Sequence, residues 1–305
     1  MTTTTDAPPL DISQAPKIAG YSLQVPGHPE IEIAQAAHRI RLVNKWQNDT
    51  GSIVFPGARV LELGCGQGNT TAVLAEAVRE TGRVDALDPA PPDYGAPFTL
   101  DQAQRYISAG PVGPRIVWHR AAPVDFLRST ASDTVWDVAV LAHCIWYFAC
   151  KQELEDILAA LRGRVKRVCI AEYALHASEK AAIPHVRAVI ARGALESHKE
   201  ESTANVRSPL SPEVIKEVAS RSGWECSSES TVVPEVGLLD GSWEVGTVVD
   251  EHFLEEVYEA VPNDEIRDII SSARDATIAA VAALKGDQVR TMDVWVATFA
   301  PSASR

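Results

Sequence analysis

Residues 60–71, VLELGCGQGNTT, decide the fold of this chain. An apolar strand that carries Glu62 breaks into a turn with Gly64, Gly66 and Gly68 at G-x-G-x-G spacing, and the helix-compatible run TTAVLAEAVRE follows. A strand, a tight turn and a helix N-terminus let a ligand approach the backbone closely and meet unpaired N–H donors. The stretch therefore predicts a cofactor-binding turn. A strand-to-helix turn without a ligand is the alternative.

The turn differs from the pattern that binds dinucleotides. Its glycine spacing is one residue tighter than the G-x-G-x-x-G that cradles a pyrophosphate. Glu62, just before the turn, would repel a diphosphate but could hold an ammonium group. Both features favour a cofactor without a pyrophosphate and count against an NAD-dependent oxidoreductase.

A second acidic residue supports the prediction that a ligand binds at the glycine turn. The segment RVDALDPA predicts another buried strand that ends at Asp88, 24 residues after Gly64. In a strand–helix–strand unit this spacing puts a carboxylate at the tip of the neighbouring strand, where it can accept hydrogen bonds from both hydroxyls of a ribose.

Glu62, the glycine turn and Asp88 together resemble the class I S-adenosylmethionine-dependent methyltransferases, over roughly residues 55–175. The resemblance implies an α/β, Rossmann-like fold: a seven-stranded, mostly parallel sheet with an antiparallel edge strand and helices on both faces. It also implies S-adenosyl-L-methionine as cofactor and S-adenosyl-L-homocysteine as product. The expected cofactor-binding residues are Tyr21, Glu62, Gly64, Cys65, Gly66, Gly68, Asn69, Thr70, Asp88, Pro89, Ala122, Asp125 and His143.

Length and charge limit the remaining possibilities. A chain of 305 residues that is 46% hydrophobic can bury a full core. Its net charge of −13 argues against a nucleic-acid partner, because phosphate binding requires clustered Lys and Arg. No apolar stretch is long enough to cross a bilayer, and the start lacks a secretory signal, so we expect a cytoplasmic protein without a membrane partner.

The five cysteines contain no C-x-x-C and no zinc-like spacing with histidine, so we expect free buried thiols and no metal. Cys144 follows His143 directly, but no third residue is present to orient a Cys/His nucleophile.

Strands and helices alternate along the chain, which predicts a parallel sheet covered by helices on both faces. The expected strands are 59–63, 83–88, 115–119, 136–142 and 167–173, and the expected helices include 29–47, 69–81, 151–163 and 211–223. WECSSESTVV and TMDVWVATF would complete the sheet, and the resemblance implies that this final pair runs antiparallel at one edge.

Three parts lie outside this minimal pattern. Residues 1–20 are expected to be a flexible leader, and residues 21–305 to form one methyltransferase domain. Within that domain we expect an N-terminal lid helix over about 21–48 and helical cap insertions over about 174–210 and 234–290.

Candidate chemistry lies in the loop HCIWYF, residues 143–148. His143 could act as a general base for a hydroxyl or thiol acceptor, since an ordinary histidine can accept a proton at neutral pH. The alternative is a histidine whose side chain is hydrogen-bonded to the backbone while its own backbone contacts the cofactor. Trp146 and Tyr147 could face a sulfonium, with plain core packing as the alternative. In the next loop, Tyr173 and His176 are candidates for orienting the substrate.

Two family motifs are absent. The chain lacks the D/N-P-P-Y/F motif of many enzymes that methylate amino groups of nucleobases or glutamine, and it lacks the Pro-Cys nucleophile used on cytosine. The place where the family commonly puts an acid against adenine holds Ala121 or Ala122, which leaves Asp125 as the candidate substitute.

The resulting hypothesis is methyl transfer to an oxygen, nitrogen or sulfur of a small molecule, as in fungal or bacterial methyltransferases of secondary metabolism. A protein of the same fold that binds the cofactor without methyl transfer, and less so an NAD-dependent oxidoreductase, remain alternatives. Monomer and homodimer are both open.

Overall fold

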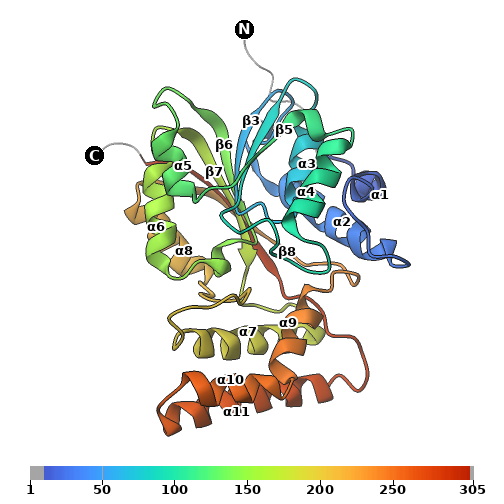
Figure 1. The fold of residues 1–305 in the computed structure, drawn as a ribbon, viewed down its shortest axis with the longest axis vertical. Coiled ribbons are helices and arrows are strands. Elements are labelled where there is room, and N and C mark those ends of the chain that lie inside the picture. The colour runs from blue at the N-terminus through green and yellow to red at the C-terminus, as the bar shows by residue number, and fades with distance from the viewer. Residues whose placement is uncertain (1–9, 50, 303–305) are drawn as a thin grey trace.

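Seven strands form one twisted sheet in the order β5-β4-β3-β6-β7-β9-β8 (Figure 1). The protein is described by a computed structural model over residues 10–49 and 51–302. The strands are β3 (Arg59–Leu63), β4 (Arg83–Leu87), β5 (Ile116–His119), β6 (Trp136–Ala142), β7 (Val165–Tyr173), β8 (Trp224–Val232) and β9 (Val294–Pro301). β3 to β7 pair in parallel, whereas β9 is antiparallel to both β7 and β8. The expected fold class is confirmed, including the antiparallel pair at one edge.

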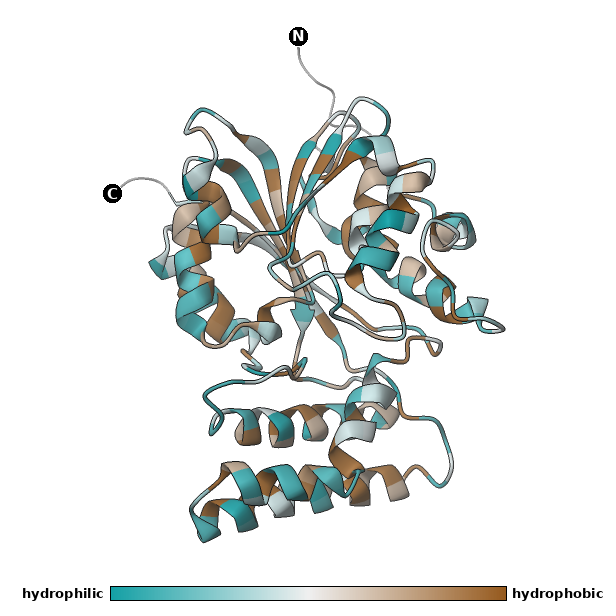
Figure 2. Cartoon of the chain, viewed as in Figure 1, coloured by the Kyte–Doolittle hydropathy of each residue, from teal (hydrophilic) through white to brown (hydrophobic). Residues whose placement is uncertain are grey.

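Alternation along the strands gives the sheet an apolar core on each face (Figure 2). In β3, Val60 belongs to one core, while Leu61 and Leu63 belong to the other. The first core includes residues of α1 (Ala15–Ala19), α2 (Pro29–Lys45), α3 (Asn69–Ala77) and α4 (Leu100–Ala109), and the second residues of α5 (Pro123–Ser129), α6 (Lys151–Ala160) and α8 (Pro212–Arg221). The sheet is therefore a middle layer between two helical layers.

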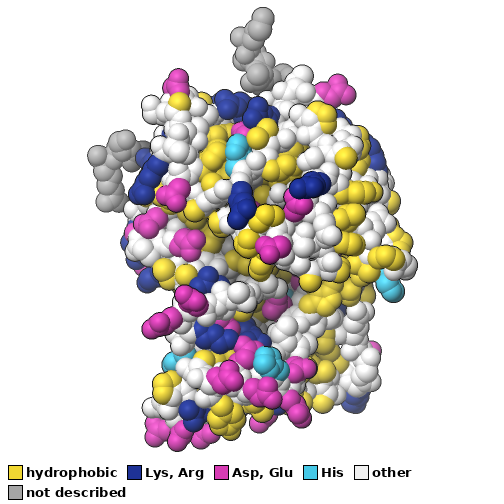
Figure 3. Space-filling model, viewed as in Figure 1, with side chains coloured by type: hydrophobic (Ala, Val, Ile, Leu, Met, Phe, Trp, Pro, Cys, Tyr) yellow, Lys and Arg dark blue, Asp and Glu magenta, His cyan; other side chains and the backbone are white. Residues whose placement is uncertain are grey.

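A further group of helices lies beyond the carboxyl ends of the strands (Figure 1). It consists of α7 (Ile183–Glu196), α9 (Asp240–Val249), α10 (His252–Ala260) and α11 (Asp264–Ala282). Leu195, Val248, Phe253 and Ile270 from these four helices form a third apolar core. Acidic side chains are numerous on the surface of this part (Figure 3). Shorter elements are η1 (Ile12–Gln14), η2 (Gly113–Arg115), η3 (Ile145–Tyr147), η4 (Lys180–Ala182) and the β1 (Gln47–Asn48) and β2 (Gly51–Ser52) pair.

The expectation of a flexible leader is wrong for residues 10–20. Leu10 and Ile18 are only 6% and 1% exposed, because η1 and α1 pack against α2 and α3. Asn44 of α2 fixes the segment further: its Oδ1 accepts a hydrogen bond of 2.8 Å from the backbone N–H of Leu10. Residues 1–9 of the expected leader lie outside the described residues.

Other details differ from the sequence prediction. The helices α4, α5 and α9 were not expected, although α4 begins with a capping box between Thr99 and Gln102 that the sequence displays. Cys150 and Cys226 are exposed rather than buried, because they lie at the start of α6 and on the edge strand β8. None of the helices in the described part of the chain is long and apolar enough to span a membrane.

Candidate active site

The loops after β3, β4 and β6 surround a cavity of about 920 Å³. The chain runs outward from β3 to β5 on one side and continues with β6 and β7 on the other, so the strand order reverses between β3 and β6. Open α/β sheets bind ligands at such a point, beyond the carboxyl ends of the strands. The cavity therefore lies where the fold favours a cofactor.

The three glycines of the turn have different roles, although all have positive φ. A Cβ on Gly64 would lie 2.5 Å from Cys144 Cβ, and one on Gly68 would lie 2.7 Å from Ile107 Cδ1. A Cβ on Gly66 would meet no atom within 4 Å. Gly64 and Gly68 are therefore required by packing, whereas Gly66 presents its bare backbone to open space. Gly64 and Gly66 line the cavity, and Gly68 lies behind it as the N-cap of α3.

Asp88 lies beside this turn, as the spacing predicts. Its Oδ2 accepts a hydrogen bond of 2.8 Å from the backbone N–H of Gly66, and its Oδ1 accepts one of 2.9 Å from Ala90. Each carboxylate oxygen keeps a further lone pair. Asp88 and Pro89 line the cavity, so the acid both shapes the turn and offers acceptors to a ligand.

Glu62 does not have the predicted orientation. It is 2% exposed, does not line the cavity, and accepts a hydrogen bond of 2.5 Å from Thr71 Oγ1 beneath the turn. Burial raises the pKa of Glu62 to about 8, so the group is mostly uncharged at neutral pH. It is a poor partner for an ammonium group and instead connects β3 to α3.

His143 lines the cavity and is held in a left-handed backbone conformation, with φ of 53°. Its Nε2 lies 3.1 Å from Nε2 of His38, and its Nδ1 lies 3.6 Å from Oε1 of Glu172. A carboxylate at that distance favours the tautomer with the proton on Nδ1 of His143, so that Nε2 accepts a hydrogen bond from His38. Burial lowers the pKa of both histidines, so both are neutral at pH 7.

Cys144 does not provide a nucleophile. Burial raises the pKa of its thiol well above the ordinary value, and its side chain packs against Gly64.

The aromatic candidates lie at different depths. Tyr147 lines the cavity and is 44% exposed. Trp146 is 2% exposed and donates a hydrogen bond of 3.0 Å to the carbonyl of Leu210, which corresponds to the core-packing alternative. Tyr173 lies one layer behind the cavity: its ring is 4.4 Å from that of His143, and its hydroxyl donates to Asp240 at 2.9 Å.

Four other candidates lie away from the cavity. The hydroxyl of Tyr21 donates to Glu76, and the His176 side chain is 68% exposed and lies 2.9 Å from Asp293. Ala122 and Asp125 lie at the start of α5 and do not line the cavity. The structure therefore gives these four side chains no direct contact with this site.

Several lining residues escaped the sequence analysis. Arg39 comes from α2, Tyr94 from the loop before α4, and Asn205 and Arg207 from the segment after α7. None of them belongs to a recognisable motif, so only the tertiary packing brings them to the turn. Of the expected cofactor-binding residues, Cys65, Asn69 and Thr70 also line the cavity. The other lining residues include Gln67, Ala90, Gly95, Ala96, Leu100, Ala142, Phe148 and Glu153.

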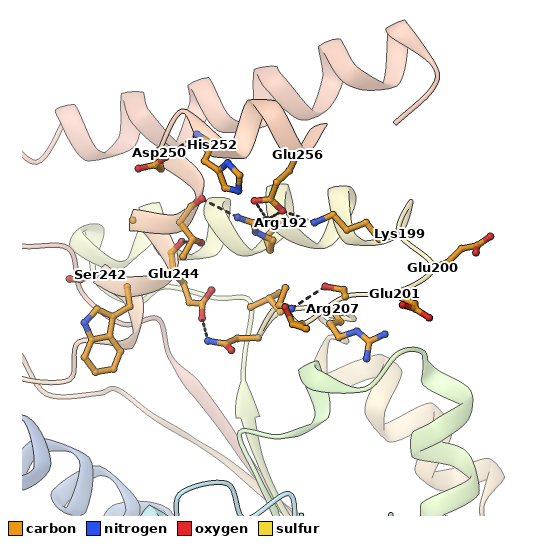
Figure 4. A pocket seen from close by; sticks show the side chains of 18 residues that line it. Arg192, Lys199, Glu200, Glu201, Arg207, Ser242, Glu244, Asp250, His252 and Glu256 are labelled. Carbon is orange, nitrogen blue, oxygen red and sulfur yellow. Dashed lines mark hydrogen bonds and ion pairs between the residues drawn. The ribbon is translucent and has the colours of Figure 1, made fainter. Parts of the chain in front are cut away.

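A second cavity, of about 1290 Å³, opens among α7, α9, α10 and the segment 199–207 (Figure 4). Its wall contains an ion-pair network in which Arg192 and Lys199 both contact Glu256, at 2.9 and 2.5 Å. Asn205 and Arg207 line both cavities. The second cavity is therefore next to the first, at the side opposite the sheet.

A buried histidine near the site makes stability depend on pH. Nδ1 of His185 accepts the backbone N–H of Met292 at 3.0 Å, and burial lowers the pKa of His185 to about 4. Between pH 7 and 5 the unfolded histidine takes up a proton and the folded one does not, so the free energy of unfolding should fall by about 2 kcal/mol through this residue. Urea unfolding of wild type and His185→Gln, which keeps an acceptor, checks this. An equal pH dependence in both would contradict it.

Comparison with known proteins agrees with this geometry. The family model of protein-L-isoaspartate(D-aspartate) O-methyltransferase matches residues 36–91. Two proteins of Diaporthe leptostromiformis, methyltransferases phomM' and phomM, are each 28% identical over 279 residues, covering 77% of this chain and 71% of the relative. A crystal structure from Lactobacillus casei, described as a cyclopropane-fatty-acyl-phospholipid synthase-like protein, superposes with a TM-score of 0.82 at 27% identity, over 95% of this chain and 100% of that one.

The sheet, the glycine turn and these similarities identify the chain as a class I S-adenosylmethionine-dependent methyltransferase, and S-adenosylmethionine is its cofactor. The cavity fits that group in two respects. Gly66 leaves open space for close approach, and among the described residues Asp88 accepts hydrogen bonds only from the backbone of Gly66 and Ala90, which leaves acceptor positions for a ligand. Buried nitrogens of Arg39 and His143 also lack hydrogen-bond partners among the described residues.

Proposed function

We propose that this enzyme transfers the methyl group of S-adenosylmethionine to an oxygen, nitrogen or sulfur of a small organic molecule. The observation that carries the proposal is the cavity at the reversal of the strand order, which brings Gly66, Asp88 and His143 together. When bound, the cofactor supplies a methyl group on a sulfonium, which an acceptor atom can attack in line.

The residues of the chain would then align the acceptor with the cofactor, shield both from water and remove the proton of the acceptor. Gly66 admits the cofactor to the backbone, and Asp88 accepts hydrogen bonds from ribose hydroxyls. Tyr147 and Phe148 offer aromatic faces at the other wall, where a sulfonium is attracted to the ring. Neutral His143 can accept a proton from the acceptor at Nε2, the nitrogen that accepts from His38 in the ligand-free protein, so the acceptor would displace that hydrogen bond. Proximity and orientation alone can contribute roughly 7 to 11 kcal/mol.

A small acceptor is supported by the surroundings of the site. The net charge of −13 disfavours nucleic acid. The helices α7, α9, α10 and α11 lie beyond the ligand edge of the sheet, and the second cavity between them offers room for an acceptor next to Arg207. In this proposal residues 174–210 and 234–290 act as a cap that excludes water, with the 21–48 segment as a lid.

Product analysis tests the function directly. The protein is incubated with S-adenosylmethionine and a panel of small phenols, carboxylic acids, amines and thiols, and S-adenosylhomocysteine is quantified by mass spectrometry. We expect acceptor-dependent formation of S-adenosylhomocysteine together with a product that is one methylene heavier. Bound cofactor without turnover across the panel would support the same fold without methyl transfer, and tight NADH binding would support the oxidoreductase alternative.

A further inference from the structure

A buried arginine in the wall of the cofactor cavity lacks an ion-pair partner in the described part of the chain. Arg39 lies in the middle of α2 and is 8% exposed, and its Nε and Nη1 are buried without a hydrogen bond among the described residues. No carboxylate of the described chain lies within ion-pair distance of it, although it lines the cavity beside His143.

The other buried arginine of the described chain shows what a structural role requires. Arg192 is 7% exposed, but its Nη1 donates to both carboxylate oxygens of Glu256, at 3.0 and 2.9 Å, and its Nη2 donates to the carbonyl of Thr247. Arg39 has none of these partners. Its side chain is therefore not explained by the stability of the ligand-free protein.

None of the acids around Arg39 forms an ion pair with it among the described residues. Burial raises the pKa of Glu32, two turns earlier in α2, and the charge of Arg39 opposes that rise, but the two side chains make no ion pair. Glu62 accepts a hydrogen bond from Thr71, and the two oxygens of Asp240 accept hydrogen bonds from Tyr173 and Gln35. A guanidinium cannot lose its charge at ordinary pH, and a buried unpaired charge is costly. Its planar fork matches a carboxylate, which it binds through two parallel hydrogen bonds.

We propose that Arg39 binds the carboxylate of a ligand inside this cavity. The proposal rests on the proposed function, because it takes the cavity as the site of methyl transfer. Two ligands supply the same chemistry: the amino-acid carboxylate of the cofactor, or a carboxylate on the acceptor. Either source would neutralise the buried guanidinium when the site fills.

The first test uses the ligand-free protein. Arg39→Met removes an unpaired buried charge, so we expect the melting temperature to stay equal to that of wild type or to rise. Arg41→Met is the matched control, since Arg41 lies two residues along the same helix and forms an exposed ion pair with Glu235. A fall in melting temperature for Arg39→Met, together with wild-type ligand responses, would overturn the proposal and make Arg39 a structural residue.

The second test identifies the source of the carboxylate. Calorimetry compares S-adenosylhomocysteine with 5′-methylthioadenosine, which keeps the nucleoside thioether but lacks the amino-acid part. If the cofactor supplies the carboxylate, Arg39→Met weakens binding of S-adenosylhomocysteine by about 10- to 100-fold and leaves 5′-methylthioadenosine unchanged. Arg41→Met should change neither.

If the acceptor supplies the carboxylate, both nucleosides bind Arg39→Met normally. Benzoate and octanoate, used as probes, then raise the melting temperature of the S-adenosylhomocysteine complex of wild type but not of Arg39→Met. If Arg39→Met keeps both the wild-type affinity for S-adenosylhomocysteine and the wild-type rise in melting temperature with the two carboxylates, the proposal is overturned. A wild-type protein that binds neither nucleoside would refute the proposed function instead. The role of Arg39 would then be decided by the carboxylates alone: benzoate and octanoate should raise the melting temperature of wild type and not that of Arg39→Met, and an equal effect on both would overturn the proposal.

Discussion

Gly66→Val is expected to abolish binding of S-adenosylhomocysteine while the protein stays folded. A Cβ at Gly66 meets no protein atom within 4 Å, so the added side chain would project into the space that the cofactor requires. Calorimetry should show no measurable heat of binding, and the far-UV circular-dichroism spectrum should match that of wild type.

The backbone conformation requires a control, because φ at Gly66 is +52° and a side chain there is strained by roughly 1 to 2 kcal/mol. Gly163 provides that control. Its φ is +73°, a Cβ there also meets nothing within 4 Å, and it lies in the turn after α6, away from the cavity. Gly163→Val should lose similar stability yet bind the ligand normally. Equal affinities of both variants would show that Gly66 does not face the cofactor.

The sequence was sufficient to predict the sheet and the first half of the site. The alternation of apolar strands with helical segments predicts parallel pairing, and the short distance from the glycine turn to the next strand end predicts that Asp88 lies beside Gly66. These contacts are local in topology, since they arise within one strand–helix–strand unit. Their positions therefore follow from the chain order alone.

The rest of the site depends on packing between distant segments. His38 is 105 residues before His143, yet their ring centroids are 5.3 Å apart because α2 packs beside α3 on one face of the sheet. Arg207 reaches the cavity because its backbone N–H donates to the carbonyl of Trp146. The orientation of the Glu62 side chain was also not predicted. The alternation of β3 turns this side chain toward α3, where Thr71 donates a hydrogen bond to it. Periodicity alone does not say which polar partner a buried acid will meet.

Two features of His143 guide the choice of a substitution. Its φ of 53° is unfavourable for most side chains, but asparagine adopts this conformation more readily than alanine. Asparagine cannot act as a base at neutral pH. His143→Asn therefore removes the proton acceptor while it keeps the left-handed turn after β6. His176→Asn is a matched control, because His176 is exposed and lies outside the cavity.

We expect His143→Asn to lower kcat by about 100- to 10,000-fold on the acceptor found by product analysis, with little change in the affinity for S-adenosylhomocysteine. The base must be neutral, and burial lowers the pKa of His143 below the ordinary 6.5, so the wild-type rate should stay high through neutral pH and fall only below that value. His143→Asn should lack this acidic limb, and His176→Asn should keep it. If turnover and cofactor affinity fall equally, His143 binds the cofactor and the proton must leave by another route, of which the hydrogen-bonded His38 is the nearest.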